Sequence, residues 1–306
     1  MNSAIKIIKR LNLSARRKLV DVLSGNYLSA FKGQGIEFDD LREYVAGDSV
    51  KDIDWNATAK TGTVFIRKYI ETRELKINFA VDASHSMFWG SRSDVQKIDI
   101  AVSLIYLIAQ IAIRNGDRYG AELVKNGKIS YIEPRKSRSH FLKIYKALKV
   151  LSPRANSLEE ASEPSVNDLQ LIFRNLIAYQ RGKSLCFFIT DLLDLENKDL
   201  LRLICAANKK HEIVIVQIFD HAELFPELLP DSQFQDSETK LINQIDFSDP
   251  NFLRQYKEEV VNYQKALHNF TLENNIDLLI LNSQDDIVLQ LILFLRKRQR
   301  LRNVRH

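Results

Sequence analysis

Glycine, proline and cysteine are all scarce in this chain, and each shortage narrows the class of protein. Only 10 of its 306 residues are glycine and 6 are proline, which argues against long flexible linkers. The two cysteines, Cys186 and Cys205, are too few for a disulfide framework or a metal cluster. We interpret them as small buried residues in a reducing compartment.

A long apolar run is also missing. The N-terminus has no signal-peptide core, and the most apolar stretch, residues 98–113, is interrupted by Asp99 and Gln110. We therefore expect a cytoplasmic protein without a transmembrane segment. Hydrophobic residues at 45% and charged residues at 27% are ordinary for a globular protein, and a chain of this length can form one elaborated α/β domain.

The formal net charge is +5, and much of the excess lies at the two ends of the chain. Residues 1–24 are predicted to form a basic amphipathic helix, and residues 295–302 form a second basic run. Such ends can contact nucleic acid, an acidic membrane surface or an acidic partner, although a solvated helix end is the commoner meaning. The chain lacks a recognition motif for nucleic acid, so that function is kept only as an alternative.

From residue 76 onward, strand-like and helix-like segments alternate. This order predicts an α/β fold with a mostly parallel sheet and helices on both faces, which would form the main domain at residues 76–306. Residues 25–75 are polar and rich in turns, and we expect them to be a small extension packed on that domain. The expected strands are 64–70, 76–81, 118–124, 128–132, 185–190, 213–219 and 277–281, and the expected helices are 95–115, 141–151, 166–179, 200–210, 250–274 and 285–300.

Two of the buried strands end in carboxylates. Asp82, Ser84 and Ser86 follow the first of them at every second position, and Asp191 follows the strand at 185–190. Ligands of parallel sheets bind at the carboxyl ends of the strands, and carboxylate with hydroxyl oxygens suits Mg²⁺ or Mn²⁺. The alternative is structural, because the serines would also serve as caps of the following helix and Asp82 as the cap of a turn.

The pattern Asp82-x-Ser84-x-Ser86 with Thr190-Asp191 resembles the metal-ion-dependent adhesion site of von Willebrand A domains. The resemblance implies a von Willebrand A-like, Rossmann-like sheet and protein binding through a bound cation. Members of that family usually add a threonine from a second loop, but no threonine occurs here between Thr72 and Thr190. Ser137 and Ser139 are the nearest candidates for that ligand.

The polar segment at residues 35–48, together with Ile53-Asp-Trp55 and Thr58-Ala59, resembles the hallmark of the domain of unknown function 58 family. The similarity extends to Asp220-His-Ala-Glu223. That bacterial family is commonly encoded beside MoxR-type AAA+ ATPases. The resemblance therefore implies an adaptor or client-recognition role with a MoxR-type ATPase, in the assembly or maturation of other proteins.

The same polar segment has a physical interpretation of its own, because acidic residues surround three aromatic side chains. It is either an internal polar lattice that supports the fold or a docking face with an aromatic anchor, and the two roles can coexist. Trp55 would be buried in the first case and exposed in the second. The candidate partner-binding residues are Glu37, Phe38, Arg42, Tyr44, Asp48, Asp54 and Trp55.

An enzyme is the main rival hypothesis. Phosphatases of the haloacid dehalogenase type also place an aspartate after the first strand, but they need a second aspartate two residues later as general acid, where this chain has Ser84. Gly182-Lys183-Ser184 lacks the earlier glycine of a phosphate-binding loop and precedes a strand. We therefore predict a non-enzymatic protein with no small-molecule substrate.

Overall fold

The computed structural model describes residues 13–31, 36–45, 47–50, 53–71, 74–91, 95–125, 128–151, 166–180, 182–191, 194–224, 231–235, 242–246 and 249–304. Its centre is a six-stranded sheet of order β10-β7-β6-β3-β4-β5. All neighbouring strands are parallel except β4 and β5. The predicted mostly parallel α/β sheet is therefore confirmed. The strands are β3 (Lys76–Val81), β4 (Arg118–Lys125), β5 (Lys128–Arg135), β6 (Leu185–Thr190), β7 (Glu212–Phe219) and β10 (Asp277–Asn282).

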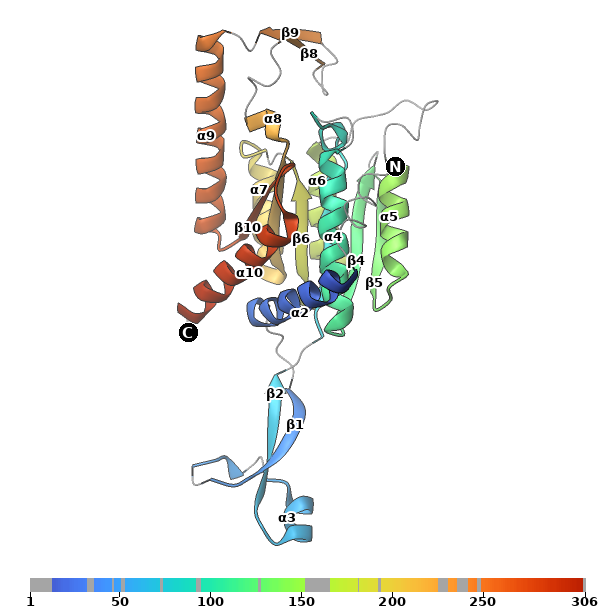
Figure 1. Ribbon diagram of the computed structural model, residues 1–306, viewed down its shortest axis with the longest axis vertical. Coiled ribbons are helices and arrows are strands. Elements are labelled where there is room, and N and C mark those ends of the chain that lie inside the picture. Colours follow the sequence, from blue (N-terminus) through green and yellow to red (C-terminus); the bar gives the residue numbers. More distant parts are fainter. Residues whose placement is uncertain are drawn as a thin grey trace.

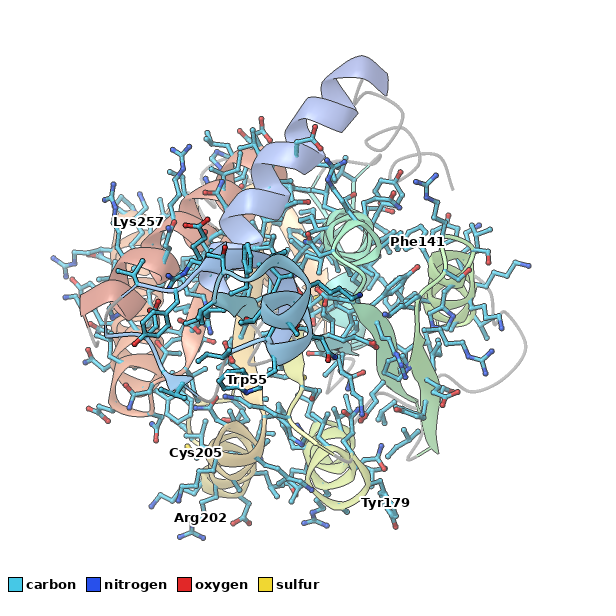
Figure 2. The ribbon with its side chains drawn as sticks, turned by 90° about the horizontal axis from the view of Figure 1, so that it is seen from below. Trp55, Phe141, Tyr179, Arg202, Cys205 and Lys257 are labelled. Carbon is cyan, nitrogen blue, oxygen red and sulfur yellow. The ribbon has the colours of Figure 1, made fainter. Side chains whose placement is uncertain are left out.

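Helices cover both faces of this sheet (Figures 1 and 2). In Figure 2, Tyr179 and Arg202 mark the layer on one face and Phe141 lies on the other side. The first layer comprises α2 (Leu13–Ala30), α4 (Lys97–Arg114), α5 (His140–Val150) and α10 (Ile287–Val304). The second comprises α6 (Val166–Tyr179), α7 (Lys198–Lys210) and α9 (Pro250–Glu273).

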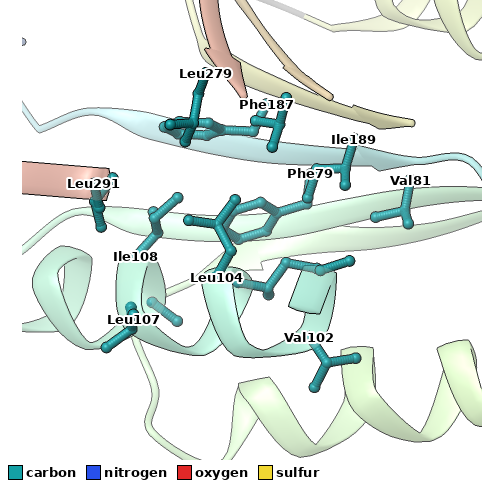
Figure 3. Packing of buried hydrophobic residues seen from close by; sticks show 14 of the residues in the cluster. Phe79, Val81, Val102, Leu104, Leu107, Ile108, Phe187, Ile189, Leu279 and Leu291 are labelled. Atoms are coloured by element: carbon teal, nitrogen blue, oxygen red, sulfur yellow. The ribbon is translucent and has the colours of Figure 1, made fainter. Parts of the chain in front are cut away.

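The hydrophobic core follows from the two-residue period of the strands. In β3, Phe79 and Val81 point toward α4, whereas Ala80 points toward α6 and α7. Figure 3 shows Phe79 beside Leu104 of α4, and the rings of Phe79 and Phe187 stack with their centroids 5.9 Å apart. Because α4 is apolar around nearly all of its circumference, it is buried as the central helix of its layer. Each large side chain buried here contributes about 1.5–3 kcal/mol to stability.

Arg298 of α10 joins the two ends of the chain. Its Nε donates to the carbonyl oxygen of Ala30 at 3.1 Å, and its guanidinium lies over the ring of Phe31 at 4.3 Å from the centroid. The same guanidinium pairs with Glu212 and Asp277, at the starts of β7 and β10. This buried arginine therefore holds the end of α2 against the amino edge of the sheet.

The residues between α2 and β3 form an antiparallel hairpin with a short helix, which we call the arm: β1 (Ile36–Glu43), α3 (Trp55–Thr61) and β2 (Phe65–Glu71). Figure 1 shows the arm projecting beyond the amino edge of the sheet, which differs from the expected extension packed on the main domain. Its backbone bonds are internal, as in those from Tyr44 N to Val64 O and from Asp54 N to Phe65 O.

The first helix of the body also differs from its predicted bounds. A helix was expected over residues 1–24, but α2 continues through Gly25 to Ala30 and buries Leu23 and Tyr27. Residues 1–12 lie outside the described part of the chain. Tertiary packing of the apolar face thus carries the helix past a residue that weakens helices.

Four short elements had no clear pattern in the sequence. They are η2 (His85–Phe88), α8 (His221–Leu224) and the hairpin of β8 (Asp231–Gln235) with β9 (Ile242–Asp246). Within the described ranges, no helix combines the length and apolar character needed to cross a membrane. Cys186 is buried, as expected, whereas Cys205 is half-buried.

Candidate metal site at the carboxyl edge of the sheet

The structure brings Asp82 and Asp191 to the same edge of the sheet. Each directly follows the last residue of its strand, and β3 and β6 are parallel neighbours. The backbone N–H of Asp82 donates to Ile189 O at 2.8 Å, which fixes the two strand ends side by side. Asp82 is 4% exposed and Asp191 6% exposed, so both carboxylates are buried.

The two predicted serines lie next to Asp82. The Asp82 Oδ1 atom accepts from the backbone N–H of Ser84 at 2.9 Å, and Oδ2 accepts from the Thr190 hydroxyl at 2.7 Å. The hydroxyl oxygens of Ser84 and Ser86 are 2.9 Å apart. The buried side chain of Met87 in η2 anchors this loop in the core.

This geometry separates the two interpretations of the serines. Ser84 occupies the N-cap position of η2, but its side chain makes no capping hydrogen bond. Its hydroxyl pairs with Ser86 instead, so the helix-capping explanation fails for Ser84. Asp82 does close a turn onto Ser84, as the structural alternative expected, and this bond uses only Oδ1.

Electrostatics at Asp82 indicate a shortage of positive charge. Burial, with a further contribution from the negative charge of Asp191, raises the pKa of Asp82 to about 6. Hydrogen bonds from Thr190 and Ser84 oppose this rise without cancelling it. A cation bound beside Asp82 would stabilise its ionised form.

Lys97 is the main component of the site that the sequence analysis missed. Its Nζ atom lies 2.7 Å from Asp191 Oδ2 and 2.5 Å from Glu223 Oε1, and the residue is only 2% exposed. It also lies over the Trp89 ring, 5.8 Å from the centroid. Burial alone would lower the pKa of Lys97, but the ion pairs with Asp191 and Glu223 outweigh burial and raise it.

The position of Lys97 in its helix was a usable signal. Lys97 is the first residue of α4, where the helix dipole disfavours a cation. Gly90 helps to shape this segment, because a Cβ atom there would lie 2.2 Å from Val95 O. A lysine at a helix N-terminus therefore suggests a fixed anionic partner that offsets the unfavourable dipole.

Glu223 reaches the site from α8, which follows the neighbouring strand β7. The Asp220 backbone N–H donates to Glu223 Oε2 at 2.8 Å, and Asp220 Oδ1 accepts from Ala222 N at 3.0 Å. The hydroxyl of Tyr256 in α9 donates to Glu223 O at 2.7 Å. The Asp220-His-Ala-Glu223 stretch thus forms a short capped turn that presents Glu223 to Lys97.

Ser137 and Ser139 do not belong to this site. They follow β5, which runs antiparallel to β4 and therefore ends at the amino edge of the sheet. There the two hydroxyls pair with each other at 2.8 Å, and Ser137 O accepts from the Tyr119 hydroxyl. Asp82 lies at the opposite edge, so the proposal of these serines as the missing ligands is wrong.

The candidate partner-binding residues lie in the arm. Arg42 makes a bidentate pair with Asp48, at 2.8 and 2.7 Å. Asp54 caps α3 by accepting from Asn56 N and Ala57 N. Tyr44 is exposed, and Trp55 is 64% exposed, which excludes a buried structural tryptophan. The side chains of Glu37 and Phe38 lie outside the described part.

One turn of the arm is formed around a glycine, Gly47. Gly47 has a φ of +110°, a conformation that favours glycine. Asp48 Oδ2 also accepts from Val45 N at 2.9 Å, closing the turn around that glycine. Gly35 lies outside the described residues.

The donor set at the carboxyl edge fits a hard divalent cation. Adjacent ligands of an octahedral Mg²⁺ with bonds of about 2.1 Å lie about 3 Å apart, which matches the separation of 2.9 Å between the Ser84 and Ser86 hydroxyls. Among the described residues, no three His, Cys, Asp or Glu side chains meet as metal ligands. A cation here would therefore depend on at most two carboxylates, those of Asp82 and Asp191, together with the two serines and water.

Comparison with known proteins identifies the family. The family model described as "Protein of unknown function DUF58" matches residues 40–266, and the chain belongs to this family. Uncharacterised proteins of Mycobacterium tuberculosis and Mycobacterium bovis are each 26% identical over 237 residues, covering 78% of this chain and 72% of the relative. The family description names no activity.

Solved structures with a similar chain path are distant. The conserved hypothetical protein BatB from Bacteroides thetaiotaomicron is 13% identical with a TM-score of 0.43, and the alignment covers 74% of this chain and 99% of BatB. The PilB minor pilin from Streptococcus sanguinis is 10% identical with a TM-score of 0.38, covering 78% and 64% respectively. The chemistry of the site is therefore argued from its own geometry.

Proposed function

We propose that this protein is a von Willebrand A-like, non-enzymatic protein-binding module that depends on a divalent cation. Asp82, Ser84 and Ser86 would bind Mg²⁺ or Mn²⁺ directly, and Asp191 would act directly or through water. The observation that carries the proposal is the buried Asp82 carboxylate beside two hydroxyls spaced like adjacent metal ligands. A bound cation would supply a Lewis-acidic position for an anionic group of the partner.

Charge balance supports a divalent ion in particular. Asp82, Asp191 and Glu223 supply three negative charges when ionised, and Lys97 offsets one of them. The buried Asp220 lies in the same turn as Glu223, so at least two negative charges remain for a cation such as Mg²⁺ or Mn²⁺ to offset. Burying that charge without compensation would be costly, and the raised pKa of Asp82 reflects this cost.

The residue at position 84 supports binding over catalysis. A phosphatase of the haloacid dehalogenase type needs a general acid there, and serine cannot act as one near neutral pH. We therefore expect no phosphate release from phosphate esters or nucleotides. Steady release by the wild type that is lost in Asp82→Asn would reverse this part of the proposal.

The partner assignment rests on the family resemblance. We propose that the chain works with a MoxR-type AAA+ ATPase as an adaptor or client-recognition partner in the assembly or maturation of other proteins. A carboxylate of the bound protein would complete the shell of the cation, which makes binding sensitive to EDTA. The exposed Trp55 in the arm offers a second contact for a partner.

Calorimetry with Mn²⁺ and Mg²⁺ tests the metal site. The wild type should bind one ion, and Asp82→Ala should abolish this binding. Asp199→Ala is the matched control, because Asp199 is an exposed aspartate of α7 that pairs only locally with Arg202. Equal binding by wild type and Asp82→Ala would remove the proposed site.

Affinity capture followed by mass spectrometry tests the partner. The protein should retain partners in Mg²⁺, and it should lose them in EDTA and in folded Ser84→Ala protein. Capture that is unaffected by EDTA would show that the cation is not part of the interface.

A further inference from the structure

Lys97 places a positively charged side chain inside the proposed metal site, where a second cation is not expected. Its ammonium group contacts Oδ2 of Asp191 at 2.7 Å, inside the cluster that we propose to bind a divalent ion. The same ammonium contacts Glu223 at 2.5 Å. Lys97 therefore bridges Asp191, a proposed member of the metal site, and Glu223, which is not a proposed ligand.

We propose that Lys97 is a built-in competitor of the divalent cation for Asp191, and that Glu223 is the acceptor that retains the lysine when the cation binds. This inference rests on the proposed function. It assigns Lys97 and Glu223 opposite effects on metal affinity, although neither residue ligates the ion.

The competition follows from charge and from hydrogen bonding. An ammonium ion and a metal ion repel each other, and both are attracted to the same carboxylate. Lys97 is held close to that carboxylate because its backbone N–H donates to Trp89 O at 3.1 Å and its side chain packs over the indole of Trp89. It cannot retreat into solvent without losing this packing, since it is 2% exposed.

Glu223 provides an alternative partner for the lysine. It is fixed by two bonds from its own turn and from α9: its Oε2 accepts from Asp220 N, and its carbonyl oxygen accepts from the Tyr256 hydroxyl. This second fixed carboxylate lets Lys97 give up its contact with Asp191 while it keeps one ion pair. Without Glu223, Lys97 would depend on Asp191 alone and would compete more strongly.

The test is the affinity for Mn²⁺, measured by calorimetry on the full chain. Lys97→Met keeps the aliphatic packing on Trp89 and removes the charge, and it should bind Mn²⁺ about tenfold more tightly than wild type. Glu223→Gln should bind several-fold more weakly. Lys198→Met is the matched control, because Lys198 is the exposed first residue of α7. This variant should bind Mn²⁺ with the affinity of wild type.

The double variant Lys97→Met/Glu223→Gln separates competition from overall charge. Its net charge equals that of wild type, so a general electrostatic effect predicts wild-type affinity, which would overturn the proposal. Competition predicts tighter binding than wild type, because the ammonium is absent. If Lys97→Met does not fold, as judged by circular dichroism, Glu223→Gln still provides a test, because it keeps the ammonium and should bind Mn²⁺ more weakly than wild type; unchanged affinity in that variant would overturn the proposal.

The outcomes distinguish this inference from the proposed function. Binding by wild type with unchanged affinity in Lys97→Met would overturn the competition and leave the metal site in place. The absence of Mn²⁺ binding in wild type and in both Lys97 variants would overturn both.

Discussion

The carboxyl-edge site and the arm are both rich in polar residues, but they are held together in different ways. At the site, Thr190 and Asp82 are 108 positions apart in the sequence, and the two partners of Lys97 lie 94 and 126 positions away. In the arm, Arg42 and Asp48 are 6 positions apart, and Asp54 caps residues 2 and 3 positions later. Polar contacts of the site therefore depend on the whole fold, whereas those of the arm are local.

The two regions also differ in burial, because the site is enclosed and the arm is exposed. Asp82, Asp191 and Lys97 are almost fully enclosed, so removal of one partner leaves another without compensation. The arm exposes its ion pair and several apolar side chains, namely Tyr44, Val45, Val50, Trp55 and Val64. Substitutions at the site should therefore change stability strongly, and substitutions in the arm should change mainly what the protein contacts.

The largest expected effect is that of Lys97→Ala without metal. This change leaves Asp191 buried without its cation and should cost about 3–5 kcal/mol of unfolding free energy. Urea denaturation in EDTA measures it. Lys198→Ala is the control and should stay within about 0.5 kcal/mol of wild type. A loss below about 1 kcal/mol for Lys97→Ala would mean that the two regions differ less than their burial suggests.

A smaller loss of unfolding free energy is expected from Thr190→Val. The substitution keeps the shape but removes the buried hydroxyl that donates to Asp82, which should cost about 1–3 kcal/mol. It should also raise the pKa of Asp82 further and weaken Mn²⁺ binding near pH 7. Ser103→Ala removes a buried hydroxyl that bonds only within its own helix and should cost less. Equal losses in the two variants would contradict a special role for Thr190.

The unfolding free energy should depend on pH through Asp117, which bonds to the chain on both sides of the arm, at α2 and just before β3. Asp117 accepts from the Tyr27 hydroxyl and from Leu75 N, and burial raises its pKa to about 6. The folded state therefore binds the proton more tightly than the unfolded state. The resulting stability is fully present below about pH 4 and is lost as pH rises through about 6, with a slope of at most about 1.4 kcal/mol per pH unit.

Asp117→Asn tests this contribution. Unfolding free energies measured in EDTA between pH 4 and pH 7 should fall less steeply with rising pH in the variant than in wild type. Asparagine can still accept from Leu75 N and contact Tyr27, so the fold should persist. A slope identical to that of wild type would show that Asp117 titrates normally.

The smallest effect on stability is expected from Trp55→Ala. Because the side chain is 64% exposed, the loss should stay within about 0.5 kcal/mol, far below the cost of truncating a buried tryptophan. Partner capture should nevertheless fall if the arm is a docking face. Thermal unfolding and affinity capture on the same preparation measure both. A large loss of stability would show that the arm is packed more tightly than its exposure indicates.

Much of the fold could be predicted because its patterns are local. The continuous apolar runs of β3 and β6 and the end of α4 at Asn115 follow from neighbouring residues. The convergence of Asp82 and Asp191 also followed, since both come directly after parallel strands. In contrast, no local pattern connects Lys97 with Glu223.

The error at Ser137 and Ser139 has a different origin. The sequence pair Asn126-Gly127 between the two expected strands is a strong hairpin signal, and a hairpin returns the chain to the opposite edge of the sheet. Counting edges would have placed both serines far from Asp82. The bounds of the first helix failed for a tertiary reason, because packing of Leu23 and Tyr27 in the core outweighs the low helix propensity of Gly25.

Arg298 has a consequence for how the chain matures on the ribosome. The residue whose carbonyl it binds, Ala30, is made 268 residues earlier. At typical rates of synthesis that interval is on the order of tens of seconds, during which the end of α2 and the ring of Phe31 lack the guanidinium that covers them. The arm needs only its own residues and can form soon after it emerges. The helix that precedes the arm in the chain must therefore wait for the last helix before it is locked in place.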